Sequence, residues 1–377
     1  MAVRKLMIVT PEFGVDADGT YRPSGIAQVA RCILRGVASS PQLERIKAVS
    51  LLDSNAALSS TLGNHLGHQR AAVEMFGCNG NKVLFSAQVA RSSLRNDMVL
   101  FLHIGLSRLA PLLLRRSYGV WMYGIEVRRP LTKLELWAFQ RATSLFSISE
   151  FTASEMRRYN PTVPKPSVVH LCVEPDHAWS DAAPSEGAGF DAATRGPAIL
   201  TVGRMASSER YKGHEQLIDA WPLVLSRCPN AELWIAGDGD DRLRLETRAR
   251  QLPNGCGARV HFLGRVSHSE LLSRYASSMA FAMPSLGEGF GLVFVEAMRY
   301  GLPCIASHDA AAEVVVDGET GFVVDQEPHA IGNACVRLLS DDALANRMGR
   351  AGHERFLARY QYSQFRERLL QALKLQT

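Results

Sequence analysis

The sequence predicts an α/β protein built from two domains. Short apolar runs of the kind that form buried parallel strands alternate along the chain with stretches of helical periodicity. The alternation stops at residues 178–197, which are rich in Ala, Gly, Ser, Pro and Asp, and restarts at Ile199. A chain of 377 residues is long enough for two domains of ordinary size. We therefore expect a first domain at 1–177, a linker at 178–197, a second domain at 198–358 and a C-terminal helical segment at 359–377.

The composition is typical of a soluble globular protein, with 46% hydrophobic and 21% charged residues. No apolar run approaches the roughly eighteen residues of a membrane-spanning helix, because the longest clear one, 99–106, is interrupted by His103. The apolar run 6–9 that follows Arg4 and Lys5 is too short for a signal peptide. The seven cysteines are widely spaced and form no C-x-x-C pair, which argues against a zinc site or a disulfide framework. We expect a protein of the reducing cytoplasm.

Basic residues are concentrated in the first half of the chain. Residues 1–180 contain 21 Lys and Arg against 13 Asp and Glu, whereas the remainder contains 21 against 24. This asymmetry favours an anionic partner or an anionic membrane surface for the first domain, and a solvated basic surface without a partner is the alternative. The segment 106–116 is both apolar and basic, so we expect a helix there. That helix either lies at an anionic lipid surface or is buried with its arginines reaching solvent.

The first domain begins with a buried strand and a capped helix. Strands are expected at 6–9, 46–52, 98–103 and 120–123, with a loop at 77–81. Ser24 can cap a helix whose apolar residues recur at helical spacing as far as Val37. His103 lies at the carboxyl end of its strand, where open α/β sheets present functional groups. A polar residue that simply ends a strand is the alternative for His103.

The second domain repeats the alternation and contains a glycine-rich turn. Strands are expected at 199–202, 232–236, 259–263, 280–283 and 303–306, with helices from Gly213, at 343–360 and at 364–375. After the strand 280–283, Gly287, Gly289 and Gly291 allow the backbone to approach a ligand closely. The following helix would leave the amides of Phe290, Gly291 and Leu292 free to donate to phosphate or sugar oxygens.

Two carboxylates and two cations accompany this turn. Glu288 lies within it, and Glu296 lies about two helical turns further on, so both can accept hydrogen bonds from hydroxyl groups. Arg204 follows the strand 199–202, and Lys212 comes eight residues later. A guanidinium fork and a compact ammonium charge together can neutralise a diphosphate whose bond to a sugar is breaking.

The interval from Glu288 to Glu296 resembles the E-x(7)-E motif of retaining glycosyltransferases with the GT-B fold, in particular glycosyltransferase family 4 (glycosyl transferases group 1). The Gly-Arg pair at 203–204 and the Lys-Gly pair at 212–213 match the family in the same order, and the resemblance extends over essentially the whole chain. It implies two Rossmann-like, doubly wound domains facing each other across a cleft. The first would bind the acceptor and the second the nucleotide sugar, and the C-terminal helix would cross back onto the first domain.

The resemblance also implies roles for the second-domain residues. Glu296 would bind the ribose of the donor, and Arg204 and Lys212 would bind its diphosphate. Glu288 and the amides of 290–292 would hold the hexose.

Five further positions are assigned by the resemblance alone. Val266 belongs to the segment whose backbone cradles the nucleobase. Gly25 would place an amide near the diphosphate, although family members usually carry Gly-Gly there and this chain has only the second glycine. His103 would lie beside the transferred sugar, and Tyr123 and Glu126 would contact the acceptor. The candidate catalytic residues are therefore His103, Arg204, Lys212 and Glu288.

The implied reaction is transfer of a hexose from a UDP- or GDP-linked donor to a glycan or lipid-diphosphate-linked glycan, in bacterial surface polysaccharide or lipopolysaccharide biosynthesis. Retention would follow from attack on the face that the diphosphate leaves. No metal or other cofactor is expected, since no aspartate pair or histidine cluster offers ligands and two cations already cover the diphosphate. No nucleic-acid partner is expected, and the basic first domain could hold the protein at the inner face of the cytoplasmic membrane.

Two alternatives stay open. One is a GT-B nucleotide-sugar epimerase or phosphorylase, and the other is a non-catalytic subunit that binds a nucleotide sugar. The sequence does not distinguish the donor base, the sugar or the acceptor.

Overall fold

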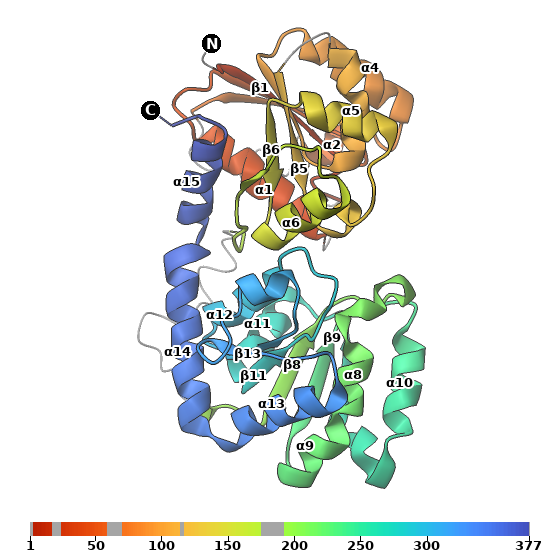
Figure 1. Cartoon of the computed structure of the whole chain (residues 1–377), viewed down its shortest axis with the longest axis vertical. Coiled ribbons are helices and arrows are strands. Elements are labelled where there is room, and N and C mark those ends of the chain that lie inside the picture. Colours follow the sequence, from red (N-terminus) through yellow and green to blue (C-terminus); the bar gives the residue numbers. More distant parts are fainter. Residues whose placement is uncertain (1–2, 17–23, 59–69, 114–116, 175–191, 377) are drawn as a thin grey trace. The chain divides into compact units, whose positions relative to one another are not determined.

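The computed structural model describes residues 3–16, 24–58, 70–113, 117–174 and 192–376. The chain divides into two compact units (Figure 1). The first consists of Met1–Glu174 together with Tyr362–Thr377, and the second consists of Pro175–Gln361. The predicted linker falls mostly outside the described residues.

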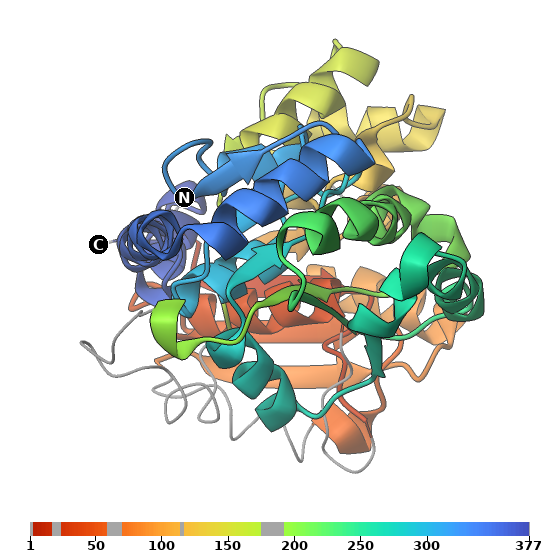
Figure 2. The same cartoon turned by 90° about the horizontal axis from the view of Figure 1, so that it is seen from below.

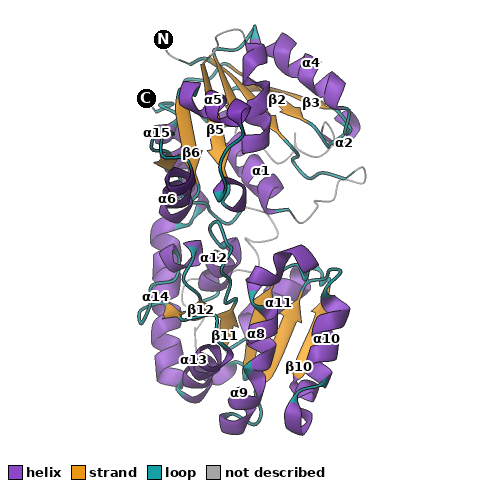
Figure 3. Ribbon diagram, turned by 45° about the vertical axis from the view of Figure 1, so that its right-hand side comes forward, coloured by secondary structure: helices purple, strands orange, loops and turns teal. Residues whose placement is uncertain are grey.

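The first unit contains a seven-stranded parallel sheet in the order β3-β2-β1-β4-β5-β6-β7 (Figure 3). Its strands are β1 (Lys5–Thr10), β2 (Arg45–Ser50), β3 (Ala72–Gly77), β4 (Met98–Phe101), β5 (Ser117–Met122), β6 (Ser144–Ser147) and β7 (Ser167–Val168). Its helices are α1 (Gly25–Ala38), α2 (Asn55–Ala57), α4 (Lys82–Ser93), α5 (Lys133–Arg141), α6 (Glu150–Tyr159) and α15 (Tyr362–Ala372). The strand β1 lies inside the sheet, and its uninterrupted apolar run 6–9 is completely buried.

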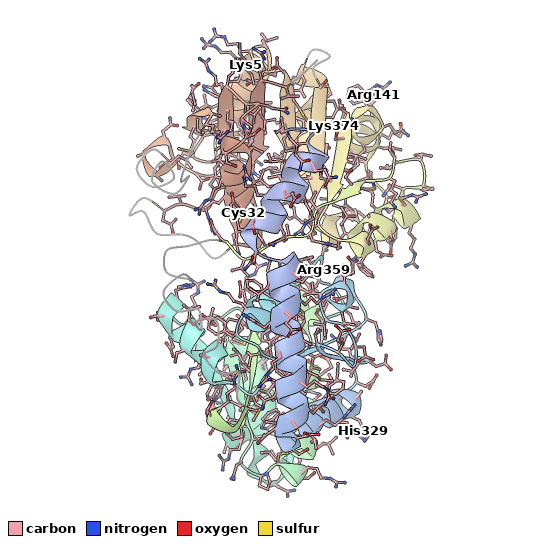
Figure 4. The ribbon with its side chains drawn as sticks, turned by 90° about the vertical axis from the view of Figure 1, so that its left-hand side faces the viewer. Lys5, Cys32, Arg141, His329, Arg359 and Lys374 are labelled. Atoms are coloured by element: carbon pink, nitrogen blue, oxygen red, sulfur yellow. The ribbon has the colours of Figure 1, made fainter. Side chains whose placement is uncertain are left out.

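The helix α1 begins where the sequence predicted. The Ser24 hydroxyl accepts a hydrogen bond from the Ala27 amide, which satisfies one of the otherwise unpaired first-turn donors. One face of α1 packs against α15, which lies along the surface of the first unit (Figure 4). The two helices approach closely at Gly36, where an added Cβ would lie 2.9 Å from Leu369 Cδ2. The final helix of the chain thus belongs to the first unit and covers α1.

The second unit contains a six-stranded parallel sheet in the order β10-β9-β8-β11-β12-β13. Its strands are β8 (Ala198–Val202), β9 (Glu232–Ala236), β10 (Val260–Gly264), β11 (Ala280–Ala282), β12 (Cys304–Ala306) and β13 (Gly321–Val323). Its helices are α8 (His214–Asp219), α9 (Trp221–Arg227), α10 (Arg242–Arg250), α11 (His268–Ser277), α12 (Leu292–Arg299), α13 (Pro328–Ser340) and α14 (Asp342–Arg359). Helices α8, α9 and α13 pack together on one face of the sheet, and α11 covers the other (Figure 2).

In each parallel sheet, successive strands are first added toward one edge and then toward the other, so the strand order reverses at one point. In the first unit β1 lies between β2 and β4, and in the second unit β8 lies between β9 and β11. Connections on either side of such a point leave the sheet in opposite directions and open a crevice at the carboxyl ends of the strands, where α/β proteins bind ligands. His103 follows β4, and Arg204 follows β8. The fold therefore places these two predicted residues at the reversal points of their own sheets.

Some predicted elements differ from the structure. The segment 106–116 is not an α-helix: Ile104–Leu113 forms successive 3₁₀ turns that include Pro111, and Arg115 and Arg116 lie outside the described residues. Its buried residues recur every third position, as the tighter 3₁₀ period requires. In the part of the chain that the structure describes, no helix is both long and apolar enough to span a membrane.

Candidate functional site

Three of the second-unit residues predicted to bind the donor, Arg204, Lys212 and Glu288, meet at the carboxyl ends of β8 and β11. Lys212 ends the 3₁₀ segment Ser207–Lys212, and Glu288 lies in the loop after β11. The Lys212 Nζ lies 3.4 Å from Glu288 Oε1 and 3.7 Å from Glu209 Oε2. Arg204, which is largely exposed, pairs with the other oxygen of Glu209. Two cations and two carboxylates therefore form one cluster, and the sequence analysis had not identified Glu209 as a member.

Two glycines bring these loops together. Gly213 has a φ of +80°, and a Cβ there would lie 2.3 Å from the carbonyl oxygen of Pro284. A Cβ on Gly287 would lie 2.2 Å from the ring of Tyr211. The Leu286 amide donates to the Tyr211 carbonyl at 2.9 Å and connects the same two loops. Residues with side chains at either glycine position would push the Lys212 loop away from the Glu288 loop.

The Asp309 carboxylate anchors the Glu288 loop through hydrogen bonds. Its Oδ2 accepts hydrogen bonds from the Glu288 amide at 2.8 Å and the Ser285 hydroxyl at 3.0 Å, and its Oδ1 accepts from the Ala311 amide at 2.8 Å. The side chain is buried, and burial raises the pKa of Asp309 to about 6 against the effect of those hydrogen bonds. Sequence reasoning missed Asp309, because a carboxylate twenty-one residues from Glu288 carries no local signal.

Glu296 lies on α12 and is half-buried. The Tyr275 hydroxyl donates to Glu296 Oε2 at 2.9 Å. Burial raises the pKa of Glu296 to about 7, although the Tyr275 hydrogen bond and the Arg299 charge oppose this. The carboxyl group therefore exchanges a proton near neutral pH, which makes it an acceptor whose strength depends on pH.

The remaining predicted donor positions lie at the same edge of the second-unit sheet. Phe290 and Gly291 are buried immediately before α12, which begins at Leu292. Val266 is half-buried between the end of β10 and the start of α11. Their amides therefore lie at the carboxyl ends of β11 and β10, and their contact with a donor stays a prediction.

A buried histidine adjoins Lys212. His214 begins α8 and is only 5% exposed, and burial, followed by the Lys212 charge, lowers its pKa to about 4. Its ring lies 3.7 Å from the position that a Cβ on Gly203 would take. The His214 Nε2 has no hydrogen-bond partner among the described residues. The imidazole is thus neutral at physiological pH and adds no charge to the cluster.

His103, predicted beside the transferred sugar, lies together with the two predicted acceptor residues, Tyr123 and Glu126, in the first unit. The His103 and Tyr123 rings stack with centroids 6.4 Å apart, and the Tyr123 amide donates to Glu126 Oε1 at 2.5 Å. His103 Nδ1 accepts a hydrogen bond from the Gly105 amide at 3.0 Å, so the ring proton resides on Nε2. Burial lowers the pKa of His103, against the raising effect of Glu126. The ring is a neutral hydrogen-bond donor at this edge of the first sheet.

Glu135 supports this group and was not found from the sequence. It is completely buried and accepts hydrogen bonds from Arg108 at 2.8 Å, Arg129 at 3.0 Å and the Thr132 amide at 2.9 Å. Burial alone would raise the pKa of Glu135, but these hydrogen bonds lower it to about 2. The carboxylate therefore stays ionised and fixes the two arginines near the His103 strand end.

Gly25 is the first residue of α1, and nothing lies within 4 Å of the position that its Cβ would take. Packing alone does not require glycine there. The proposed contact of its amide with a diphosphate stays a prediction. Among the described residues, no group of three or more His, Cys, Asp and Glu side chains is placed to hold a metal ion.

Comparison with known proteins identifies the second unit. Residues 196–341 match the family model for glycosyl transferases group 1. The second unit contains a group 1 glycosyl transferase domain. Over 171 residues the chain is 32% identical to a GDP-mannose-dependent monoacylated alpha-(1-6)-phosphatidylinositol monomannoside mannosyltransferase of Corynebacterium glutamicum, covering 43% of this chain and 44% of the relative. Over 177 residues it is 36% identical to a phosphatidyl-myo-inositol mannosyltransferase of Mycobacterium tuberculosis, covering 45% and 44%. The chain thus matches less than half the length of these curated relatives.

Solved structures extend the likeness to the whole chain. Anabaena Alr3699/HepE in complex with UDP and glucose aligns with a TM-score of 0.69 at 18% identity, over 99% of both chains. Sucrose-phosphate synthase from Thermosynechococcus elongatus aligns with a TM-score of 0.73 at 19% identity, over 98% of both. At this identity the structural likeness shows the fold alone. This chain, whose second unit matches the group 1 model, therefore has the GT-B fold. The predicted fold class is confirmed.

Proposed function

We propose that this protein is a retaining glycosyltransferase that moves a hexose from a nucleotide sugar to a lipid-linked sugar acceptor. The observation that carries the proposal is the cluster of Lys212, Glu288 and Arg204 at the reversal point of the second sheet, inside a group 1 glycosyl transferase domain. From residue 175 to 361 the sequence contains 17 arginines and only one lysine, Lys212. A chain that uses arginine everywhere else in this unit keeps the compact ammonium charge at this one position.

The chemistry follows from where charge develops. When the bond between the anomeric carbon and the donor phosphate breaks, negative charge accumulates on the departing diphosphate. Lys212 and Arg204 stabilise that charge, and they were positioned in advance by Glu209. Glu288 accepts hydrogen bonds from the hexose hydroxyls, and Glu296 accepts them from the ribose. Catalysis then rests on positioning and charge stabilisation.

Retention would proceed without a protein nucleophile. The acceptor oxygen forms its bond to the anomeric carbon on the face that the diphosphate leaves, and the acceptor proton passes to a departing phosphate oxygen. The neutral His103 donates a hydrogen bond to the transferred sugar. No metal is required in this scheme, so we expect transfer to be insensitive to EDTA.

The relatives suggest which donors to test first. The two mannosyltransferases act, by their names, on phosphatidylinositol-linked acceptors, and one is GDP-mannose-dependent. The HepE structures contain UDP, glucose or UDP-glucose. GDP-mannose and UDP-glucose are therefore the first candidate donors. We propose a lipid-linked acceptor in surface polysaccharide or lipopolysaccharide biosynthesis, reached from the inner face of the cytoplasmic membrane by the basic first unit.

The first test is thermal stabilisation by UDP, GDP, dTDP, ADP and phosphate. A nucleotide at a hundredfold its dissociation constant stabilises a protein by about 2.7 kcal/mol, and we expect UDP or GDP to do so. Lys212→Ala should lose most of the shift and lower transfer by at least roughly a hundredfold, the range seen when a transition-state donor is removed. Glu296→Ala should also lower transfer by orders of magnitude.

The single lysine of the second unit offers a direct readout. Reductive methylation followed by peptide mass spectrometry reports Lys212 without interference from other lysines between 175 and 361. The effective nucleotide should protect Lys212 and leave Lys82 of the first unit equally reactive. Equal labelling of Lys212 with and without every nucleotide, together with normal transfer by Lys212→Ala, would remove the proposed donor site.

A further inference from the structure

A pocket lies in the first unit between the outer strands β2 and β3 of the sheet and α4. Its volume is about 250 Å³, which suits a small molecule. Arg45 begins β2, and Arg95 and Asn96 follow the carboxyl end of α4. The pocket therefore lies toward the amino ends of the strands, whereas His103 and Tyr123 follow the carboxyl ends of theirs. His103, Tyr123 and Glu126 are not among its lining residues.

The lining of this pocket is strongly cationic. Arg45, Lys47, Arg91 and Arg95 contribute four positive charges, and Glu74 contributes one negative charge. Glu74 pairs with Lys47 across neighbouring strands. Within the described residues, none of the three arginines is paired with a carboxylate. The pocket thus has a net charge of +3 before any ligand binds, and in a concave site such charges reinforce one another.

Two further side chains of the lining, Asn96 and Phe76, are not charged. Asn96 is only 4% exposed and donates its amide Nδ2 to the Ser92 carbonyl at 2.8 Å. Its Oδ1 has no hydrogen-bond partner among the described residues, which is costly for a buried acceptor. Phe76 presents its ring beside the Lys47 ammonium, 5.8 Å from the ring centroid. The pocket therefore offers positive charge for an anion and an apolar ring surface beside it.

We propose that this pocket binds a small phosphate-bearing ligand, a phosphomonoester or diphosphate. Arginine guanidinium groups bind phosphate oxygens with paired hydrogen bonds, and two or three negative charges match the excess of the site. Such a ligand can be free in solution or be the headgroup of a lipid, and the chemistry of recognition is the same.

Some of these charges also have an explanation that needs no ligand, and an experiment must distinguish the two. The strand β3 is at the edge of the sheet, and charges facing inward near an edge hinder pairing with another chain. That role needs no ligand and predicts no phosphate binding.

The test is calorimetric titration of the full chain with pyrophosphate and with glycerol 3-phosphate. We expect two sites for pyrophosphate, one lost in Lys212→Ala and the other weakened at least tenfold in the double variant Arg91→Gln and Arg95→Gln. The matched control is Arg157→Gln with Arg158→Gln, which removes the same charge from the exposed surface of α6. Binding to the pocket should also weaken as salt is raised from about 50 to 500 mM.

A parallel measurement with phosphatidylcholine vesicles containing phosphatidic acid distinguishes the two sources of phosphate. Weaker vesicle binding by the Arg91 and Arg95 variant than by the control would assign the site to a lipid headgroup. A defect limited to the soluble phosphates would assign it to a free metabolite. If the pocket variant and the control bind both probes alike, the proposal is wrong and the charges serve the edge strand. This outcome leaves the donor site untouched, because Lys212 is tested in the same titrations.

Discussion

Glu296 connects burial, protonation and binding within a single side chain. Burial raises its pKa to about 7, so roughly half of the molecules carry a neutral carboxyl group at that pH. A ribose hydroxyl is held better by a carboxylate, which accepts on both oxygens, than by a protonated acid. If Glu296 binds the ribose, the bound state must release that proton, and below the pKa this costs affinity.

We therefore predict that nucleotide affinity increases with pH through neutrality. Because each pH unit below the pKa costs about a factor of ten, affinity at pH 6 should be roughly tenfold weaker than at pH 8. Glu296→Gln cannot titrate and should show a flatter profile, measured by calorimetry at both pH values. Ionisation of the nucleotide phosphates affects both proteins equally and cancels in the comparison. Parallel profiles for the two proteins would contradict the assignment of Glu296 to the ribose.

At this scale the sequence predicted residues that the structure brings into one cluster better than it predicted the residues that support them. Glu288 and Lys212 could be named because each belongs to a short motif with fixed spacing. Glu209 and Asp309 act through contacts between loops that are distant in the sequence. Nothing in the sequence around them distinguishes these two carboxylates from others on the surface. Their roles become visible only when hydrogen bonds such as that from the Glu288 amide to Asp309 are located.

At the scale of elements, the two loops of the donor site depend on Gly213. Its left-handed φ of +80° costs an L-residue about 1–2 kcal/mol, and an added Cβ would also overlap the Pro284 carbonyl. Gly318 has a similar φ of +73° but has nothing within 4 Å of its Cβ position. The two glycines therefore separate the conformational cost from the steric one.

We predict that Gly318→Ala lowers the free energy of unfolding by about 1–2 kcal/mol and leaves nucleotide affinity unchanged. Gly213→Ala should cost more stability and should also weaken nucleotide binding, because the Lys212 loop must move away from the Glu288 loop. Chemical denaturation and nucleotide titration of the two variants measure both effects. Equal losses of stability and of nucleotide affinity in the two variants would contradict this prediction. They would mean that the Pro284 loop moves to admit the Cβ without disturbing the donor site.

Elements with a clear apolar period were predicted within a few residues, as β9 and α14 illustrate. Others could not be predicted for identifiable reasons. β3 mixes apolar residues with Glu74 at the sheet edge, and α4 buries only three residues along its length. The segment Ile104–Leu113 contains enough apolar residues for a helix, but Pro111 removes an amide donor and the chain takes 3₁₀ turns.

At the scale of the molecule, the order of the chain differs from the order of its compact units. The second unit is continuous, whereas the first is completed by residues from the far end of the sequence. Alternation of strands and helices predicted where the second α/β unit begins. It carries no information on which unit receives the last helix, and only the resemblance supplied that expectation. The apolar residues of α15 look the same in sequence whichever surface they cover.

The contribution of α15 gives a prediction for the whole chain. Phe365, Leu369 and Leu370 are almost completely buried, and Leu373 and Leu375 beyond the helix are buried as well. Burying each such side chain contributes about 1.5–3 kcal/mol, so their joint loss approaches the 5–15 kcal/mol that stabilises an ordinary domain. A chain ending at Gln361 should therefore have an unstable first unit. The second unit keeps its own continuous core and should stay folded.

Limited proteolysis with mass spectrometry tests this directly. In the truncated chain, residues 3–174 should be degraded quickly, while a fragment containing 196–361 survives and is still stabilised by the nucleotide that stabilises the full chain. Leu369→Ala in the full chain is the milder counterpart and should cost about 2–5 kcal/mol without exposing the second unit. Equal protease resistance of residues 3–174 with and without α15 would show that α1 does not need this cover. Loss of the second-unit fragment as well would show that the two units depend on each other for stability, although each has its own sheet and core.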